Sequence, residues 1–110
     1  MITDKDREFV IKLLVSTEAG RVPWQATAVV NQYSASFKGK WIVLIDQNEN
    51  QDEVWWVMRL TDLEGRELLR VGFIEMQEIR DLYEGARRSA LKVTEALSDI
   101  VSELDEDIPF

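Results

Sequence analysis

The sequence predicts an α+β domain: an N-terminal helix, an antiparallel sheet of three or four strands, then a long C-terminal helical segment packed on the sheet. This prediction depends on two changes in the spacing of apolar residues along the chain. Apolar residues recur at helical spacing in residues 4–18 and again in residues 76–104, whereas residues 34–73 favour a period of two, which is typical of strands. The chain has 110 residues, 45% of them hydrophobic, so a single domain spanning residues 1–110 is expected.

The first helix is predicted over residues 4–18. Thr3 is a suitable N-cap because its hydroxyl can accept a bond from a free backbone N–H, and acids in the first turn complement the helix dipole. Gly20 and Pro23 are the signals that end the helix. The apolar stripe of this helix consists of Phe9, Val10, Leu13 and Leu14.

The middle of the chain is predicted to form the sheet. Residues 21–33 show no clear period and are expected to cross the domain as an irregular segment. Strands are expected at residues 41–45, 54–60 and 67–73, with a fourth at residues 33–37 along one edge. Residues 48–52 and 62–65 have the composition of a hairpin loop and of a turn. Because these connections are short, neighbouring strands should run antiparallel.

Both faces of the predicted sheet carry apolar side chains. In residues 54–60 the side chains of Trp56 and Met58 point to one face, and those of Trp55 and Val57 point to the other. Residues 41–45 are apolar on both faces. Because a sheet with one face in water alternates cleanly, we expect part of the second face to be covered by the first helix, the crossing segment or another subunit.

Residues 76–104 contain an unbroken heptad seam. As one helix these 29 residues would span about 43 Å, more than the roughly 30 Å diameter of a small domain. The helix must therefore either overhang the domain or break, and a break near Val93 and Thr94, with Thr94 as a second N-cap, remains open. The seam consists of Ile79, Tyr83, Ala86, Ala90, Val93, Leu97, Ile100 and Leu104.

The net charge is −8, and residues 93–110 hold six acids and no base. The chain lacks the cationic surface that attracts phosphate backbones and anionic membranes, so neither nucleic acid nor membrane is expected as a partner. Residues 105–110 are expected to be frayed. The acidic end is interpreted either as a solvated helix face or as a contact surface for a basic protein partner.

Cysteine and histidine are both absent. Their absence removes thiolate ligands and the commonest general base, and the serines lie in no known nucleophile motif. Residues 48–53 gather oxygen-bearing side chains, but without the acid order and central glycine of a calcium loop. We therefore expect no enzyme activity, catalytic residue, metal or cofactor. No stretch has the length of a membrane span and residues 1–12 do not resemble a signal peptide, so a cytoplasmic protein is expected.

Four short motifs stand out: WQATA at residues 24–28, Tyr33 with SFKGK at 36–40, DLEGREL at 62–68 and LYEGARRSAL at 82–91. Together they resemble a family of small, functionally uncharacterised bacterial proteins of about this length. The resemblance covers most of residues 20–104. It implies a compact bacterial accessory domain and supplies no catalytic residue.

The favoured hypothesis is a non-catalytic protein-interaction or oligomerisation module of a bacterial or phage protein, acting as a homodimer. The apolar helix seam would be its working surface, with contact residues Tyr83, Ala86, Ala90, Val93, Leu97, Ile100 and Leu104. One alternative is a small-ligand-binding domain with an aromatic pocket formed from Trp24, Trp41, Trp55 and Trp56. Another is an acidic protein that imitates nucleic acid and so inhibits a basic protein.

Overall fold

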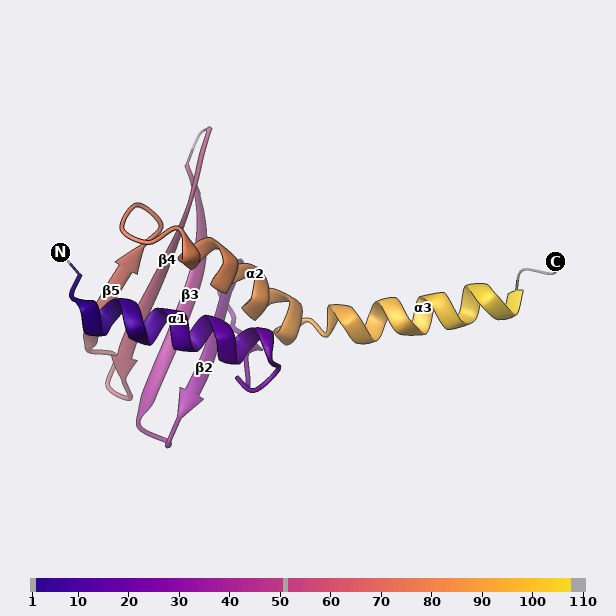
Figure 1. The fold of residues 1–110 in the computed structure, drawn as a ribbon, viewed down its shortest axis with the longest axis horizontal. Coiled ribbons are helices and arrows are strands. Elements are labelled where there is room, and N and C mark those ends of the chain that lie inside the picture. The colour runs from indigo at the N-terminus through magenta and orange to yellow at the C-terminus, as the bar shows by residue number, and fades with distance from the viewer. Residues whose placement is uncertain (1, 51, 108–110) are drawn as a thin grey trace.

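The computed structural model describes residues 2–50 and 52–107 (Figure 1). It is an α+β fold with a five-stranded sheet in the order β1-β2-β3-β4-β5, in which every neighbouring pair is antiparallel. The α+β class, the antiparallel sheet and the N-terminal helix are as predicted. The elements are α1 (Asp4–Glu18), β1 (Gln25–Ala26), β2 (Gln32–Phe37), β3 (Trp41–Asn50), β4 (Glu53–Asp62), β5 (Glu67–Gly72), α2 (Glu78–Ala90) and α3 (Val93–Asp107).

The first helix begins with a capping box, as its sequence favours. The Thr3 hydroxyl accepts a hydrogen bond from the backbone N–H of Asp6 at 3.1 Å, and the Asp6 carboxylate accepts one from the backbone N–H of Thr3 at 2.9 Å. The helix ends at Glu18, and Gly20 adopts a φ of 74° that reverses the chain direction. The predicted boundaries of this helix are therefore confirmed.

The sheet is larger than predicted at two places. The segment predicted to be irregular contains β1, a two-residue strand that pairs with β2 and adds a fifth strand at one edge. The predicted loop at residues 48–52 is also shorter than expected, because β3 continues to Asn50 and β4 begins at Glu53. Glu49 pairs with Val54 across the two strands, so the polar residues at the end of β3 remain part of the sheet.

Two turns fix the register of the hairpins. Between β2 and β3, Lys38 and Gly39 both have positive φ angles, 55° and 63°, which is the geometry that matches the twist of paired strands. Between β4 and β5, the Asp62 carboxylate accepts bonds from the backbone N–H groups of Glu64 and Arg66 and from Nε of Arg66. The backbone bond from Arg66 is the main cause that holds the pKa of Asp62 below its usual value.

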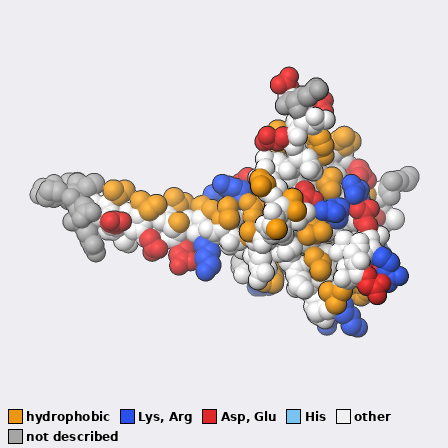
Figure 2. Space-filling view, turned by 180° about the vertical axis from the view of Figure 1, so that it is seen from behind, with side chains coloured by type: hydrophobic (Ala, Val, Ile, Leu, Met, Phe, Trp, Pro, Cys, Tyr) orange, Lys and Arg blue, Asp and Glu red, His pale blue; other side chains and the backbone are white. Residues whose placement is uncertain are grey.

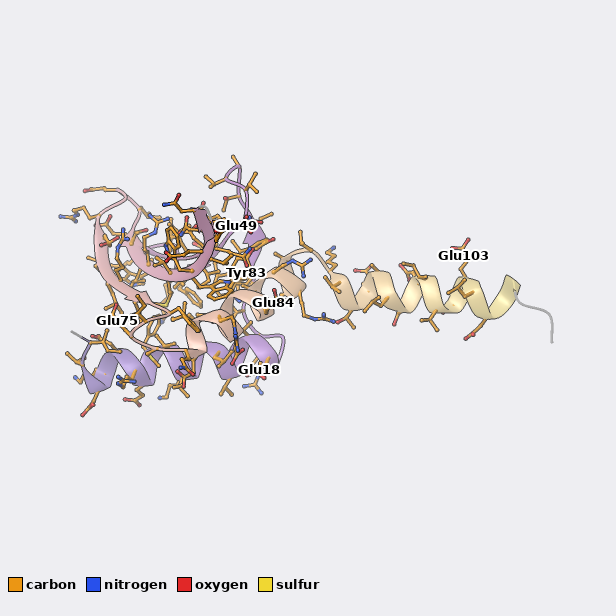
Figure 3. All side chains as sticks on the ribbon, turned by 90° about the horizontal axis from the view of Figure 1, so that it is seen from above. Glu18, Glu49, Glu75, Tyr83, Glu84 and Glu103 are labelled. Carbon is orange, nitrogen blue, oxygen red and sulfur yellow. The ribbon has the colours of Figure 1, made fainter. Side chains whose placement is uncertain are left out.

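The two helices before residue 91 form layers on one face of the sheet. Viewed from above in Figure 3, α2 lies in the concave side of the curved sheet and α1 packs on α2. Strands β2 to β5 each contribute one residue to a matched row in this interior, and the row is fully or almost fully buried: Tyr33, Ile45, Met58 and Val71. The helices complete the core with Val10, Leu13, Ile79, Leu82, Tyr83 and Ala86.

The second face of the sheet carries half-buried apolar side chains and one close ion pair. Arg59 Nη2 lies 2.9 Å from Asp46 Oδ2, and the Asp46 side chain is nearly buried. The first helix lies in the layers on the opposite face, so of the three covers expected for this second face (the first helix, the crossing segment or another subunit) the first helix is excluded. The apolar side chains on the second face are Ile42, Leu44, Trp55 and Val57.

The contact between α1 and α2 requires a glycine. A Cβ built on Gly85 would lie 2.9 Å from Cγ2 of Thr17, closer than carbon atoms pack. Thr17 is itself buried, and its hydroxyl accepts a hydrogen bond from Nε1 of Trp24 at 3.0 Å. Gly85 therefore sets how closely the two helices approach.

The C-terminal helical segment breaks, and its second half leaves the domain. Leu91 and Lys92 separate α2 from α3, and Lys92 adopts a φ of 54°. The break thus comes before Val93, and Thr94 is not the cap. Because α3 projects from the body (Figure 1), the prediction that the whole segment packs on the sheet is wrong for this half. The radius of gyration is 16.4 Å, against about 13 Å for a compact domain of this length.

Candidate protein-docking surface

The projecting helix α3 carries an exposed apolar stripe, defined here as Leu97, Ile100, Val101 and Leu104. Each of the four side chains is 51–54% exposed. They recur at intervals of three and four residues, so they share one face of the helix. Figure 2 shows the hydrophobic side chains as a continuous row along one edge of the arm.

An isolated helix of this length is only marginally stable in water. Helices shorter than about 12–15 residues gain little from propensity alone, and most helices in proteins are stabilised by packing one apolar face. In the described part of the chain, the main contact of α3 with the body is with α2, at the root of the arm. The apolar residues of the α3 stripe are therefore spaced for packing against another surface, but the described part of the body does not cover them.

Charge is separated along the arm. Acidic side chains at Glu95, Asp99 and Glu103 follow a step of four residues on the side away from the stripe. Figure 2 shows the acidic side chains along the edge opposite the hydrophobic row and basic side chains near the root. The basic residues of the root, Arg87, Arg88 and Lys92, belong to the last turn of α2 and the junction.

The structure places some of the predicted interface residues in the core and others on the projecting helix. Tyr83 and Ala86 are 2% and 0% exposed in the core of this chain, so neither is free to contact a partner. Ala90 packs partly against that core. Val93 is half-buried at the root of α3, and the remaining three, Leu97, Ile100 and Leu104, lie in the α3 stripe.

Tyr83 shows why the first half of the seam is not a docking surface. Its ring packs against that of Tyr33 with centroids 5.6 Å apart. Burial, with a smaller contribution from Tyr33, raises the pKa of Tyr83 to about 12. The heptad spacing runs on through the break at Lys92, but the residues before it face the sheet.

One residue of the α3 stripe is absent from the predicted heptad seam. Val101 follows Leu97 by four residues, is 54% exposed and lies on the same face of the helix. A helical period of 3.6 residues measured from Leu97 reaches Val101, whereas a strict heptad step skips it. That longer period is the sequence signal that could have found Val101.

The four tryptophans of the alternative ligand site do not form one pocket. Trp24 is buried and bonded to Thr17. Trp56 faces the helix layers, where it packs on Phe73, whereas Trp55 points to the opposite face of the sheet. Trp41 is 42% exposed at the start of β3.

A groove of about 520 Å³ lies at the root of α3, between the ends of α1 and α2. Most of the residues that line it are of polar or charged type, among them Arg88, Lys92, Glu18 and Glu95. Among residues 2–50 and 52–107, no group of three or more acidic, histidine or cysteine side chains could hold a metal ion. In the same part of the chain, no helix has the length and hydropathy of a membrane span.

Fold and surface together define an α+β domain with a projecting amphipathic helix. No protein-family model, curated protein or solved structure matches the chain. The resemblance to a family of small bacterial proteins therefore stays a prediction.

Proposed function

We propose that this protein is a non-catalytic protein-interaction module and that the α3 stripe is its working surface. The observation that carries the proposal is the half-exposure of four large aliphatic side chains on one face of a helix that projects from the body. Single exposed apolar residues are ordinary on protein surfaces, but a contiguous row of this kind marks an interaction site.

The energy available at this surface is adequate for a specific contact. Full burial of a Leu, Ile or Val side chain contributes roughly 1.5–3 kcal/mol, so burying the exposed half of each contributes about 1 kcal/mol. The four residues of the stripe together then contribute about 4 kcal/mol from one side of an interface. Association itself costs several kcal/mol, so we expect a moderate affinity in which every residue of the stripe matters.

The proposal is tested by placing one negative charge on either face of α3. Leu97→Asp puts the charge in the stripe, and Ser102→Asp puts it on the opposite face of the same helix. We expect Leu97→Asp to abolish self-association in sedimentation and capture of any partner from a native lysate, while Ser102→Asp leaves both intact. Because Leu97 lies outside the core, the melting temperature of the dilute protein should not change.

Two results would contradict the proposal. One is a wild-type chain that neither self-associates at high micromolar concentration nor captures any protein. The other is a loss of binding that is equal for the two variants.

A basic protein partner is a second candidate, supported by the row of acids on α3. Glu95, Asp99 and Glu103 project along one side of a helix that extends away from the body, and Figure 3 shows Glu103 pointing outward. Replacing all three by Gln leaves the stripe unchanged. A partner that is lost from this triple variant and retained by Leu97→Asp would favour the acidic face over the stripe.

A further inference from the structure

We propose that the α3 stripe pairs with the α3 stripe of a second copy of the chain in antiparallel orientation, with Leu97 of each copy against Ile100 of the other. This inference rests on the proposed function and adds the identity of the partner. It follows from the register of the seam and from the distribution of charge along the arm.

The seam of α3 has the spacing of a helix pair. Val93, Leu97, Ile100 and Leu104 follow steps of four, three and four residues, which places them at alternating core positions of a heptad. In an antiparallel pair each core layer combines one position of each kind. In this register Leu97 of one copy meets Ile100 of the other, and Val93 meets Leu104, so the two residue numbers in every layer add up to 197. All four residues are used, around a two-fold axis between residues 98 and 99.

Charge selects the antiparallel orientation over the parallel one. The sequence from residue 93 onward contains six acids and no base, so a parallel pair would hold two acidic helix ends side by side. In the antiparallel pair the acidic half of each helix lies beside the basic root of the other. The register that joins Leu97 to Ile100 places Lys92 and Asp105 of the second copy at the same height along the pair, so their charges attract at long range without forming an ion pair.

The residues that flank the seam are compatible with this arrangement. In the same register Ala96 lies beside Glu103 of the second copy, and Thr94 lies beside Val101. No flanking position opposes one acid to another. Glu95, Asp99 and Asp105 occupy the outer positions of the heptad, where they stay in water and do not oppose pairing.

The inferred contact is short, since it contains about two heptads from each copy. Such an interface lies at the small end of specific interfaces, and a dissociation constant in the micromolar range is expected. Dimerisation should therefore depend on concentration in sedimentation between about 1 and 100 µM.

Cysteine cross-linking tests the orientation directly, because the chain contains no cysteine of its own. Val93→Cys and Leu104→Cys are made separately, each with a different tag, and also co-expressed. In the antiparallel pair these two positions share a layer, whereas two copies of position 93 lie about 16 Å apart along the axis, beyond the reach of a disulfide. Ser102→Cys, on the outer face, is the matched control.

We expect a mixed disulfide dimer carrying both tags from co-expressed Val93→Cys and Leu104→Cys, and none from either variant alone or from Ser102→Cys. Strong cross-linking of each variant with itself would show a parallel pair and overturn the inference. A monomeric chain whose Leu97→Asp variant loses a different protein would also overturn it, while leaving the proposed function standing. A monomeric chain with no partner that depends on Leu97 would remove both.

Discussion

Gly85→Ala should destabilise the domain, although alanine is the better helix former. In an exposed helix interior the exchange gains up to about 1 kcal/mol. Here the new Cβ would lie 2.9 Å from Cγ2 of Thr17. Thr17 cannot rotate freely because it is buried and its hydroxyl is bonded to Trp24. Overpacking of this kind costs about 1–3 kcal/mol, so we expect a net loss of about 1 kcal/mol and a fall of about 4 °C in melting temperature.

Thr17→Ser supplies the matched background. It removes the Cγ2 that meets the new Cβ and keeps the oxygen that accepts the bond from Trp24. In that background Gly85→Ala should become neutral or stabilising by up to about 1 kcal/mol, since only the helix propensity remains. The change of sign, and not the size of either single effect, is the expected result.

Urea denaturation followed by tryptophan fluorescence measures all four proteins of this cycle. A coupling energy between the two sites of about 1 kcal/mol or more is expected for residues in contact. If Gly85→Ala had the same effect in both backgrounds, within about 0.5 kcal/mol, the close approach of α1 and α2 would not be the reason for this glycine.

Two predictions concern pH. Burial raises the pKa of Tyr83 to about 12 from 10.0, so its contribution to stability is complete below pH 10 and is lost as the pH rises towards 12; in urea titrations across this range, Tyr83→Phe should remove that part of the decline. The pKa of Asp62 is lowered from 3.8 in the folded state, so its contribution is present above pH 4 and is lost as the pH falls through the folded value. Acid titration of Asp62→Asn should show a shallower loss of stability in that range, and a slope equal to that of the wild type would refute the role of the Arg66 backbone bond.

Local chemistry explains which parts of the fold were predictable. The first helix was predicted to the residue because Thr3 and Asp6 form a capping box whose signal lies within four positions. By contrast, β1 has only two residues, too few to show a period, although it pairs with its sequence neighbour β2 across a short loop. The polar residues Asn48 and Glu49 have the composition of a loop, but the pairing of the long hairpin keeps them in β3.

The position of the helix break had no sequence signal. Helices commonly end at a glycine in the left-handed region, but here Lys92 adopts that conformation, with a φ of 54°. Threonine is a more favourable N-cap residue than lysine, yet α3 begins before Thr94 and Thr94 does not cap it. Because the apolar spacing continues across the break, sequence reasoning assigned Tyr83 and Leu97 to one surface, although only Leu97 is exposed.

A small rotation at the junction of Leu91 and Lys92 would move the far end of α3 by a large distance. A helix of 15 residues is about 22 Å long, so a rotation of 20° at the junction displaces its far end by about 8 Å. Such a rotation leaves every residue of the core in place and keeps the same number of helical residues. Circular dichroism would therefore not register it, whereas the maximum dimension from small-angle scattering would change directly with the angle of the arm.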